Sequence, residues 1–341
     1  MGTIQYVPDP PPGLLQAAKI GKVVPFVGAG ASRLAGCPNW HEFADRTLGF
    51  FVGAGKFSHA QLSQIGHLNP RVKLSIALSL AKEHNLKIPF DQVLYPTGQV
   101  DHSKGSKLYE GLSKLGKTFV TTNYDKWLDT AVGQPSLPSD QQIAHNNSSD
   151  TKTSSSLPSG TRRAIYNVRD FTAHNLDQPD TVIHLHGSMD DASTMVMTTR
   201  QYVDHYHNDR RSGDDGDENF VLTFLTTLFT QKTVLFVGYG LEELEILEYA
   251  IGKARQAAGK AGEGREIRHY LIQGFFSHEE EVMRNLAIYY AESGIGLIPF
   301  LRDQKNWDQL IDVVENFARH MPAADQMKIE RLRSMEAMLT P

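Results

Sequence analysis

Short apolar runs that end in glycine or polar residues recur along the chain, and stretches with helical spacing alternate with the later runs. This alternation predicts an α/β fold, in which a Rossmann-like parallel sheet is covered by helices on both faces. The runs, with the residues that follow them, are VVPFVGAGAS at 23–32, TFVTTNYD at 118–125, TVIHLHGS at 181–188, TVLFVGYG at 233–240, HYLIQG at 269–274 and IGLIPF at 295–300.

Helical patterns and polar segments complete the organisation. Pro25 has no backbone N–H, so we expect it at the start of the first strand or at an irregular edge. Polar or densely charged residues predict long loops at 135–160 and 205–219. We expect a single domain over residues 1–320 and a C-terminal helical tail over 321–341, which is a candidate arm for assembly. The expected helical regions are 14–19, an insertion at about 41–115, 220–230, 241–260 and 277–292.

Composition is typical of a packed globular protein. Of the 341 residues, 40% are hydrophobic and 21% are charged, and the formal net charge is −5, which gives no general attraction to nucleic acid. The one cysteine, Cys37, excludes an internal disulfide and a cysteine-based zinc ribbon. No secretory signal and no long apolar span is visible. We therefore expect a cytoplasmic protein without membrane or direct nucleic-acid partners.

Four strand ends carry residues that suit a ligand site, because ligands of doubly wound sheets bind beyond the carboxyl ends of the strands. The first, GAGAS, can hold a diphosphate at the start of the following helix. However, Arg33 stands where the dinucleotide fingerprint has its third glycine, and no P-loop lysine follows. Each end also has a structural interpretation. The glycines can simply close tight turns, Asn123 and Asp125 can cap a helix, and a histidine at a strand end can be structural.

Taken together and in order, the four ends resemble the motifs of the sirtuin superfamily. These are GAGAS at 28–32, TTNYD at 121–125, the His-Gly pair at 186–187 and the glycine turn at 238–240. GCPNWHEF at 36–43 and GYGLEELEI at 238–246 look like the versions in bacterial sirtuin-like NAD-hydrolysing domains of anti-phage defence. The resemblance covers residues 23 to about 251. It implies that NAD+ is bound as a substrate, in a pose that does not need the dehydrogenases' third glycine.

The resemblance also implies roles for individual residues. Asn123 would hold the ribose next to nicotinamide and the attacking water, since an amide donates and accepts hydrogen bonds without titrating. His186 would remove a proton from a ribose hydroxyl or from water, and Asp125 would orient the site. The NAD+-binding residues would be Gly28, Ala29 and Gly30 at the diphosphate, with Ser32 as a hydroxyl donor, Thr122 beside Asn123, and Gly238, Tyr239 and Gly240 on the adenosine side.

The sequence also contains candidate metal ligands and one thiol. His184 and His186 lie two residues apart on a strand and can face the same side, with Asp190, Asp191 or a distant residue as a third metal ligand. Protein-deacylating sirtuins carry a zinc module held by four cysteines, which this chain cannot build, so no metal is expected. No base lies near Cys37 in sequence, which predicts a core or loop thiol rather than a nucleophile.

The resemblance therefore leads to an NAD+ glycohydrolase that releases nicotinamide and ADP-ribose as a conditional effector of anti-phage defence. An NAD-dependent protein deacylase and a non-catalytic NAD or ADP-ribose sensor are the alternatives. Unrestrained NAD+ hydrolysis would drain a cofactor that the host needs. We therefore expect a homo-oligomer, a lid loop over the site, or a partner protein such as a HerA-type ATPase or a short Argonaute.

Overall fold

The computed structural model describes residues 4–98, 100–130, 161–206, 219–239, 251–252 and 266–321. Within them, seven strands form one parallel sheet in the order β3-β4-β2-β1-β5-β6-β7. This confirms the α/β class and all six predicted strands; the three-residue edge strand β3 was not predicted. The strands are β1 (Val23–Val27), β2 (Thr118–Thr121), β3 (Arg163–Ile165), β4 (Thr181–His184), β5 (Thr233–Val237), β6 (His269–Phe275) and β7 (Ile295–Leu301).

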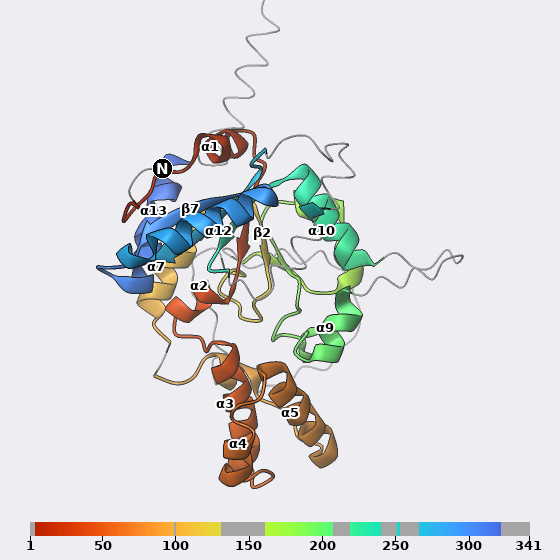
Figure 1. Cartoon of the computed structure of the whole chain (residues 1–341). Helices are drawn as coiled ribbons and strands as arrows, with labels where there is room; N and C mark the ends of the chain where they lie inside the picture. The colour runs from red at the N-terminus through yellow and green to blue at the C-terminus, as the bar shows by residue number, and fades with distance from the viewer. Residues whose placement is uncertain are drawn as a thin grey trace, which may run out of the picture.

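Helices cover both faces of the sheet, as predicted, because successive side chains of each strand point to opposite faces. Val23 and Val27 of β1 pack into a core shared with α1 (Pro12–Lys19), α7 (His102–Ser113) and α13 (Gln309–His320). Val24 and Phe26 pack into the opposite core. That second core includes residues of α8 (Ala173–Asp177), α10 (Phe220–Gln231) and α12 (Glu280–Glu292), and the layers can be followed in Figure 1.

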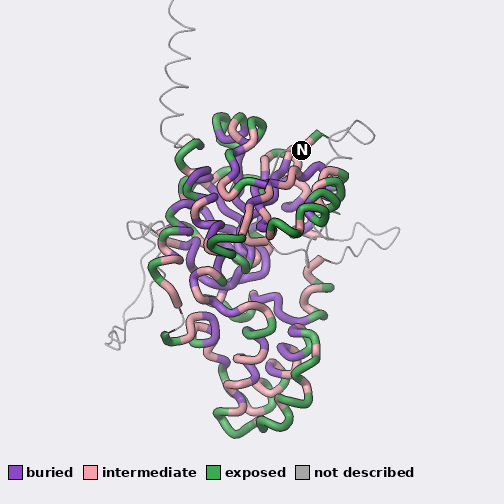
Figure 2. Tube along the Cα trace, turned by 60° about the vertical axis from the view of Figure 1, so that its left-hand side comes forward, coloured by how far each residue is buried: buried purple, intermediate pink, exposed green. Residues whose placement is uncertain are grey.

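The predicted helical insertion extends away from the sheet (Figure 1). Phe43, Leu74 and Phe90 belong to a third core, which also includes Tyr124, Met195 and Met197. The fully buried Lys73 pairs with Asp45 at 2.7 Å and so joins two helices of the insertion. The far end is exposed in Figure 2. After α2 (Ala29–Leu34), the helices of this region are α3 (Trp40–Gly53), α4 (His59–Gln64), α5 (Pro70–His84) and α6 (Phe90–Leu94), followed by α7.

Pro25 lies in the middle of β1, which is the central strand, so the prediction of a strand start or an irregular edge was wrong. β1 pairs with β5 over its whole length but with β2 only at Phe26 and Val27. The missing N–H of Pro25 therefore falls before the ladder to β2 begins. The chain entering β2 also passes close by, since a Cβ on Gly116 would lie 2.5 Å from the Pro25 ring.

Several predicted segments lie outside the described residues: the loop at 135–160, most of the helix at 241–260, and the tail at 321–341 apart from Met321. The start of the charged loop was placed too early, because His205 is helical within α9 (Thr199–Tyr206). Residues 207–218 of that loop are also outside the described part. In the described residues, no helix is both long and apolar enough to cross a membrane.

Candidate active site

The order of the strands brings the four motifs to one edge of the sheet. β4, β2, β1 and β5 are consecutive neighbours, and their last residues are in register: His184 with Thr121, Thr121 with Val27, and Val27 with Val237. Each motif continues directly beyond one of these strands. Asn123 and His186 therefore each lie two residues past the end of neighbouring strands, although 63 positions of sequence numbering separate them.

A buried hydrogen-bond network joins the glycine turn to the residues after β2. The Asn123 amide nitrogen donates to the Gly28 carbonyl oxygen at 3.0 Å and to Ser32 Oγ at 2.8 Å. The reverse amide orientation would set two acceptors against each other at Gly28. Ser32 Oγ lies 2.6 Å from Asp125 Oδ2 and donates its one hydroxyl hydrogen to that oxygen. Tyr109 must therefore donate its hydroxyl hydrogen to Ser32 Oγ, at 2.8 Å.

This network leaves one atom without a partner. Asn123 Oδ1 is buried and accepts no hydrogen bond in the described part of the chain. A buried acceptor without a donor costs free energy, and such atoms are often satisfied by a ligand or by water. Asn123 thus presents an acceptor, while its two amide hydrogens hold it in place.

Asp125 and Ser32 differ in how far they match their predicted roles. Asp125 is buried and accepts hydrogen bonds from Ser32 and from the Trp127 backbone N–H, so it can orient the site. Burial raises the pKa of Asp125, against the lowering effect of these two donors. Ser32 was expected to donate to a diphosphate. Its hydrogen is committed to Asp125 instead, which makes it a positioning residue in this arrangement.

The two glycine turns interlock. The Gly28 N–H donates to the Val237 carbonyl at 2.9 Å, and the Gly30 N–H donates to the Gly238 carbonyl at 2.8 Å. A Cβ on Gly28 or Gly30 would lie 2.6 or 2.8 Å from that same Gly238 oxygen. Gly238 itself has φ 63°, which favours glycine. The close approach of the two backbones therefore explains these glycines without a ligand, and the Gly30 N–H is not free for a diphosphate here.

The remaining predicted ligand residues lie around this junction. Ala29 is exposed at the start of α2, and Thr122 is half-buried in the turn after β2. Tyr239 is half-buried and packs its ring edge-on against Phe26, with centroids 5.3 Å apart. Gly240 lies outside the described residues.

His186 lies in a neighbouring cluster under α9. Its Nε2 is 2.7 Å from the Tyr206 hydroxyl, and the Tyr202 and His205 rings stand edge-on at 5.9 Å between centroids. The Arg71 guanidinium of α5 lies over the Tyr202 ring at 3.8 Å. Burial, and then the Arg71 charge, lower the pKa of His186 to about 3, so the ring is neutral at pH 7. The ring is also only 3% exposed, so α9 shields the predicted catalytic histidine.

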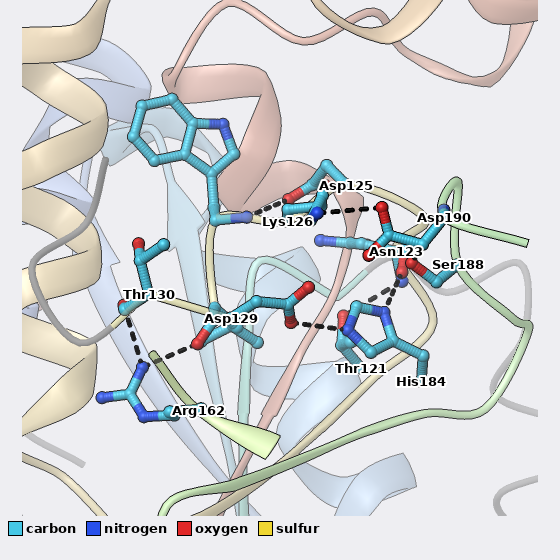
Figure 3. A network of polar contacts seen from close by, with 12 residues as sticks. Thr121, Asn123, Asp125, Lys126, Asp129, Thr130, Arg162, His184, Ser188 and Asp190 are labelled. Atoms are coloured by element: carbon cyan, nitrogen blue, oxygen red, sulfur yellow. Dashed lines mark hydrogen bonds and ion pairs between the residues drawn. The ribbon is translucent and has the colours of Figure 1, made fainter. Parts of the chain in front are cut away.

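His184 is not placed as a metal ligand. Its Nδ1 lies 3.0 Å from the Asn123 carbonyl oxygen and its Nε2 lies 2.8 Å from Asp129 Oδ1, so both ring nitrogens are engaged (Figure 3). Among the described residues, no group of three or more His, Cys, Asp and Glu side chains is placed to hold a metal ion. Cys37 is buried, as expected for a core thiol, and burial raises its pKa far above the usual range.

Sequence reasoning missed several neighbours of the predicted residues: Arg71, Tyr109, Asp129, Tyr202 and Tyr206. Tyr109 occupies an apolar position of a helix and looks like ordinary core. Asp129 follows Asp125 by four residues, and both lie in the segment after β2. This short spacing could have pointed to Asp129. The tyrosines of α9 carried no signal, since only the fold sets that helix over His186.

Comparison with known proteins identifies the class. The chain belongs to the SIR2-like domain family, whose profile matches residues 117–298 and so includes Asn123, His186 and Gly238. Domains of this family use NAD+. The chain is also similar to Defense-associated sirtuin 2 of Bacillus subtilis, with 22% identity over 241 residues. The match covers 68% of this chain and 19% of that protein, so this chain spans about a fifth of the relative's length.

Proposed function

We propose that this SIR2-like domain is an NAD+ glycohydrolase, which cleaves NAD+ to nicotinamide and ADP-ribose. Family membership supports NAD+ as the substrate. The observation that carries the proposal is the buried, unpartnered Asn123 Oδ1, because a ribose hydroxyl or a water molecule can donate to it. The fit is local: a neutral acceptor lies beside the Asp125 carboxylate at the edge of the sheet where the family motifs meet.

The reaction breaks the bond between nicotinamide and the anomeric carbon of the ribose. Nicotinamide leaves as a neutral molecule, the oxygen of water bonds to the anomeric carbon, and one water proton passes to a base. Asn123 holds the ribose or the attacking water. The negative charge of Asp125 stabilises the cationic character of the sugar. His186 takes up the proton, for which its neutral form is required.

The position of α9 over His186 supports a conditional activity. With a pKa of about 3, His186 is a weak base as long as α9 covers it. Displacement of α9 would admit water and raise that pKa toward the ordinary value. Together with the name of the Bacillus subtilis relative, this supports a role as a conditional effector of anti-phage defence. Homo-oligomerisation, or a partner protein such as a HerA-type ATPase or a short Argonaute, would supply the trigger.

Incubation of the purified protein with NAD+ and chromatography of the products tests the activity. We expect nicotinamide and ADP-ribose from the wild type and none from Asn123→Ala. Asn316→Ala is the matched control, because it removes another buried amide, which donates to the Pro8 carbonyl far along the chain. Nicotinamide release that requires an acyl-lysine peptide would instead indicate a deacylase. Binding of NAD+ without any cleavage, in the presence of the trigger, would indicate a sensor.

The shielding by α9 has its own test. Arg71→Ala removes both the stacked guanidinium on Tyr202 and the charge that lowers the pKa of His186. We expect faster hydrogen exchange in α9 and a higher basal rate of nicotinamide release. Arg71→Lys keeps the charge but loses the planar stack, so it should fall between the two. An Arg71→Ala protein with unchanged exchange in α9 and an unchanged rate would contradict the conditional mechanism.

A further inference from the structure

Behind Asn123 lies a buried pair that the proposed chemistry does not use. His184 is 0% exposed and Asp129 is 4% exposed. The His184 ring lies between two oxygens, the Asn123 backbone carbonyl at 3.0 Å and Asp129 Oδ1 at 2.8 Å (Figure 3). An ion pair removed from water is costly unless its hydrogen bonds are well formed, so such a pair needs an explanation.

The identity of the two oxygens determines the hydrogens. A carbonyl oxygen and an ionised carboxylate oxygen are both acceptors, so with Asp129 ionised both ring nitrogens of His184 carry hydrogen. His184 is then an imidazolium cation and Asp129 its carboxylate partner. The surroundings favour this charge state. Burial by itself lowers the pKa of His184, but Asp129, the contact with Asn123 and the nearby Asp125 charge together outweigh burial and raise it.

The backbone of Asp129 is held by hydrogen bonds to Lys126 and Arg162. Its backbone N–H donates to the Lys126 carbonyl at 3.1 Å, and its own carbonyl accepts the Arg162 N–H at 2.7 Å. The Arg162 guanidinium donates to the Leu128 and Thr130 carbonyls on either side of Asp129. Arg162 is a nearby cation, and burial lowers its pKa against the effects of the Asp180 and Asp129 charges. The backbone around Asp129 is therefore fixed, and the His184 ring is the hydrogen-bond partner of the carboxylate.

Asn123 is consequently held from three directions. Its amide nitrogen is fixed by Gly28 and Ser32, its backbone N–H donates to Thr121 Oγ1 at 3.0 Å, and its carbonyl receives the His184 hydrogen. Oδ1 is the one polar atom of Asn123 without a partner in the described residues. The His184 contact thus fixes the backbone from which the Asn123 side chain extends, and the bonds to Gly28 and Ser32 fix its amide group.

We propose that His184 and Asp129 are positioning residues, an imidazolium–carboxylate pair that fixes the Asn123 backbone and so aims Asn123 Oδ1 at the ligand. The pair touches no substrate and acts only through Asn123. That the ligand is NAD+ rests on the proposed function, whereas the pair and its hold on Asn123 do not.

Side-chain NMR of the ¹⁵N-labelled full chain tests the pair without any activity. The signals of the His184 ring and the Asn123 amide are identified by their loss in His184→Gln and Asn123→Ala. We expect both His184 nitrogens to carry hydrogen at pH 7, and one of them to lose it in Asp129→Asn. A ring with a bare nitrogen in the wild type would overturn the charged pair. The Asn123 amide signals should shift in Asp129→Asn, and unchanged signals there would overturn the positioning role.

Kinetics then separates positioning from general stability. In folded Asp129→Asn we expect kcat for nicotinamide release to fall about 10- to 100-fold with a small change in KM, because a slight misplacement of a reacting group costs rate. Asp45→Asn is the matched control, since it also removes a carboxylate from a buried cation, Lys73, away from the site. It should lower stability and leave kcat unchanged. A similar fall of kcat in both variants would overturn the specific role.

A double variant provides the rescue. His184→Gln combined with Asp129→Asn offers a neutral amide donor for the Asn123 carbonyl and an amide–amide contact in place of the ion pair. We expect it to recover part of the kcat lost in either single variant, because donors again face acceptors. Losses that simply add would contradict coupling between the two residues. If neither the wild type nor Arg71→Ala released any nicotinamide, the proposed function would fail, while the NMR result would still decide whether the pair holds Asn123.

Discussion

At the scale of single residues, Ser32 is the hub of the candidate site. Its hydroxyl donates to Asp125 and accepts from Asn123 and Tyr109, so all of its hydrogen-bonding capacity is used. A serine after a glycine turn suggests direct contact with phosphate. In this protein it connects the two side chains that the family motif supplies, and it does so under the surface of the site.

Removal of the Ser32 hydroxyl should therefore cost more than removal of its tyrosine partner. Ser32→Ala leaves Asp125 Oδ2 and the Tyr109 hydroxyl buried without their partner, and we expect a loss of about 1–3 kcal/mol in the free energy of unfolding. Tyr109→Phe removes one donor and leaves the other two bonds of Ser32, so about 1 kcal/mol is expected. Urea denaturation measures both. Equal losses, or no loss in Ser32→Ala, would contradict this allocation of hydrogens.

At the scale of elements, the turn between β1 and α2 packs directly against the turn after β5. The glycines of the first turn are needed because the Gly238 backbone occupies the space where their side chains would be. A test of ligand binding with a bulky residue at Gly30 would therefore mix two effects. Loss of binding would follow from disruption of the junction even if no diphosphate touched this turn.

A smaller substitution isolates the packing effect. A Cβ at Gly30 would meet the Gly238 oxygen at 2.8 Å, so Gly30→Ala should destabilise the protein. Gly49 lies within helix α3 with no atom within 4 Å of an added Cβ. Gly49→Ala should be neutral or stabilise by up to about 1 kcal/mol, as expected for a helix interior. Thermal unfolding of both variants checks this. A Gly30→Ala protein as stable as the wild type would show that the junction can relax.

At the scale of the whole molecule, buried histidines link stability to pH. Burial lowers the pKa of His186 and His269 to about 3, in each case with a nearby arginine, while an unfolded histidine titrates near 6.5. Below pH 6.5 the unfolded chain binds more protons than the folded one, so stability is complete above that pH and falls as the pH drops toward 3. Asp125, whose pKa is raised by burial, works in the opposite direction over the acid range.

We expect this loss to be measurable between pH 7 and pH 5. At pH 5 each of the two histidines should contribute a loss of about 2 kcal/mol in the free energy of unfolding. His269 Nδ1 accepts the Val234 N–H, and His269→Asn keeps an acceptor there but cannot titrate. Urea unfolding over this pH range should therefore show that the free energy of unfolding falls less steeply with decreasing pH in His269→Asn. The difference in slope should correspond to about one proton taken up on unfolding. Parallel curves for the two proteins would contradict a buried neutral His269.

The elements and the residues of the candidate site could be predicted from the amino-acid sequence. Apolar alternation with turn residues is a local property, so six strands and most helices could be predicted from it, including the helical insertion and the helix that follows the charged loop. The three residues of β3 are too few to show a period, and Pro25 misled because a missing N–H is harmful only where a ladder needs it. The motif residues could be named because their types and order resemble one family.

The role of each of those residues follows from contacts made in the folded protein. The order of the strands places β1 between β2 and β5, and this brings Gly28 against Gly238 and Asn123 against Ser32. Hydrogen-bond donors and acceptors are then shared among residues far apart in the chain, which no local pattern encodes. As a result, Ser32 donates its hydrogen to Asp125, Asn123 Oδ1 has no partner in the described residues, and His184 contacts the Asn123 backbone. Burial, which depends on every element at once, keeps His186 and His269 neutral, whereas the Asp129 charge outweighs burial at His184.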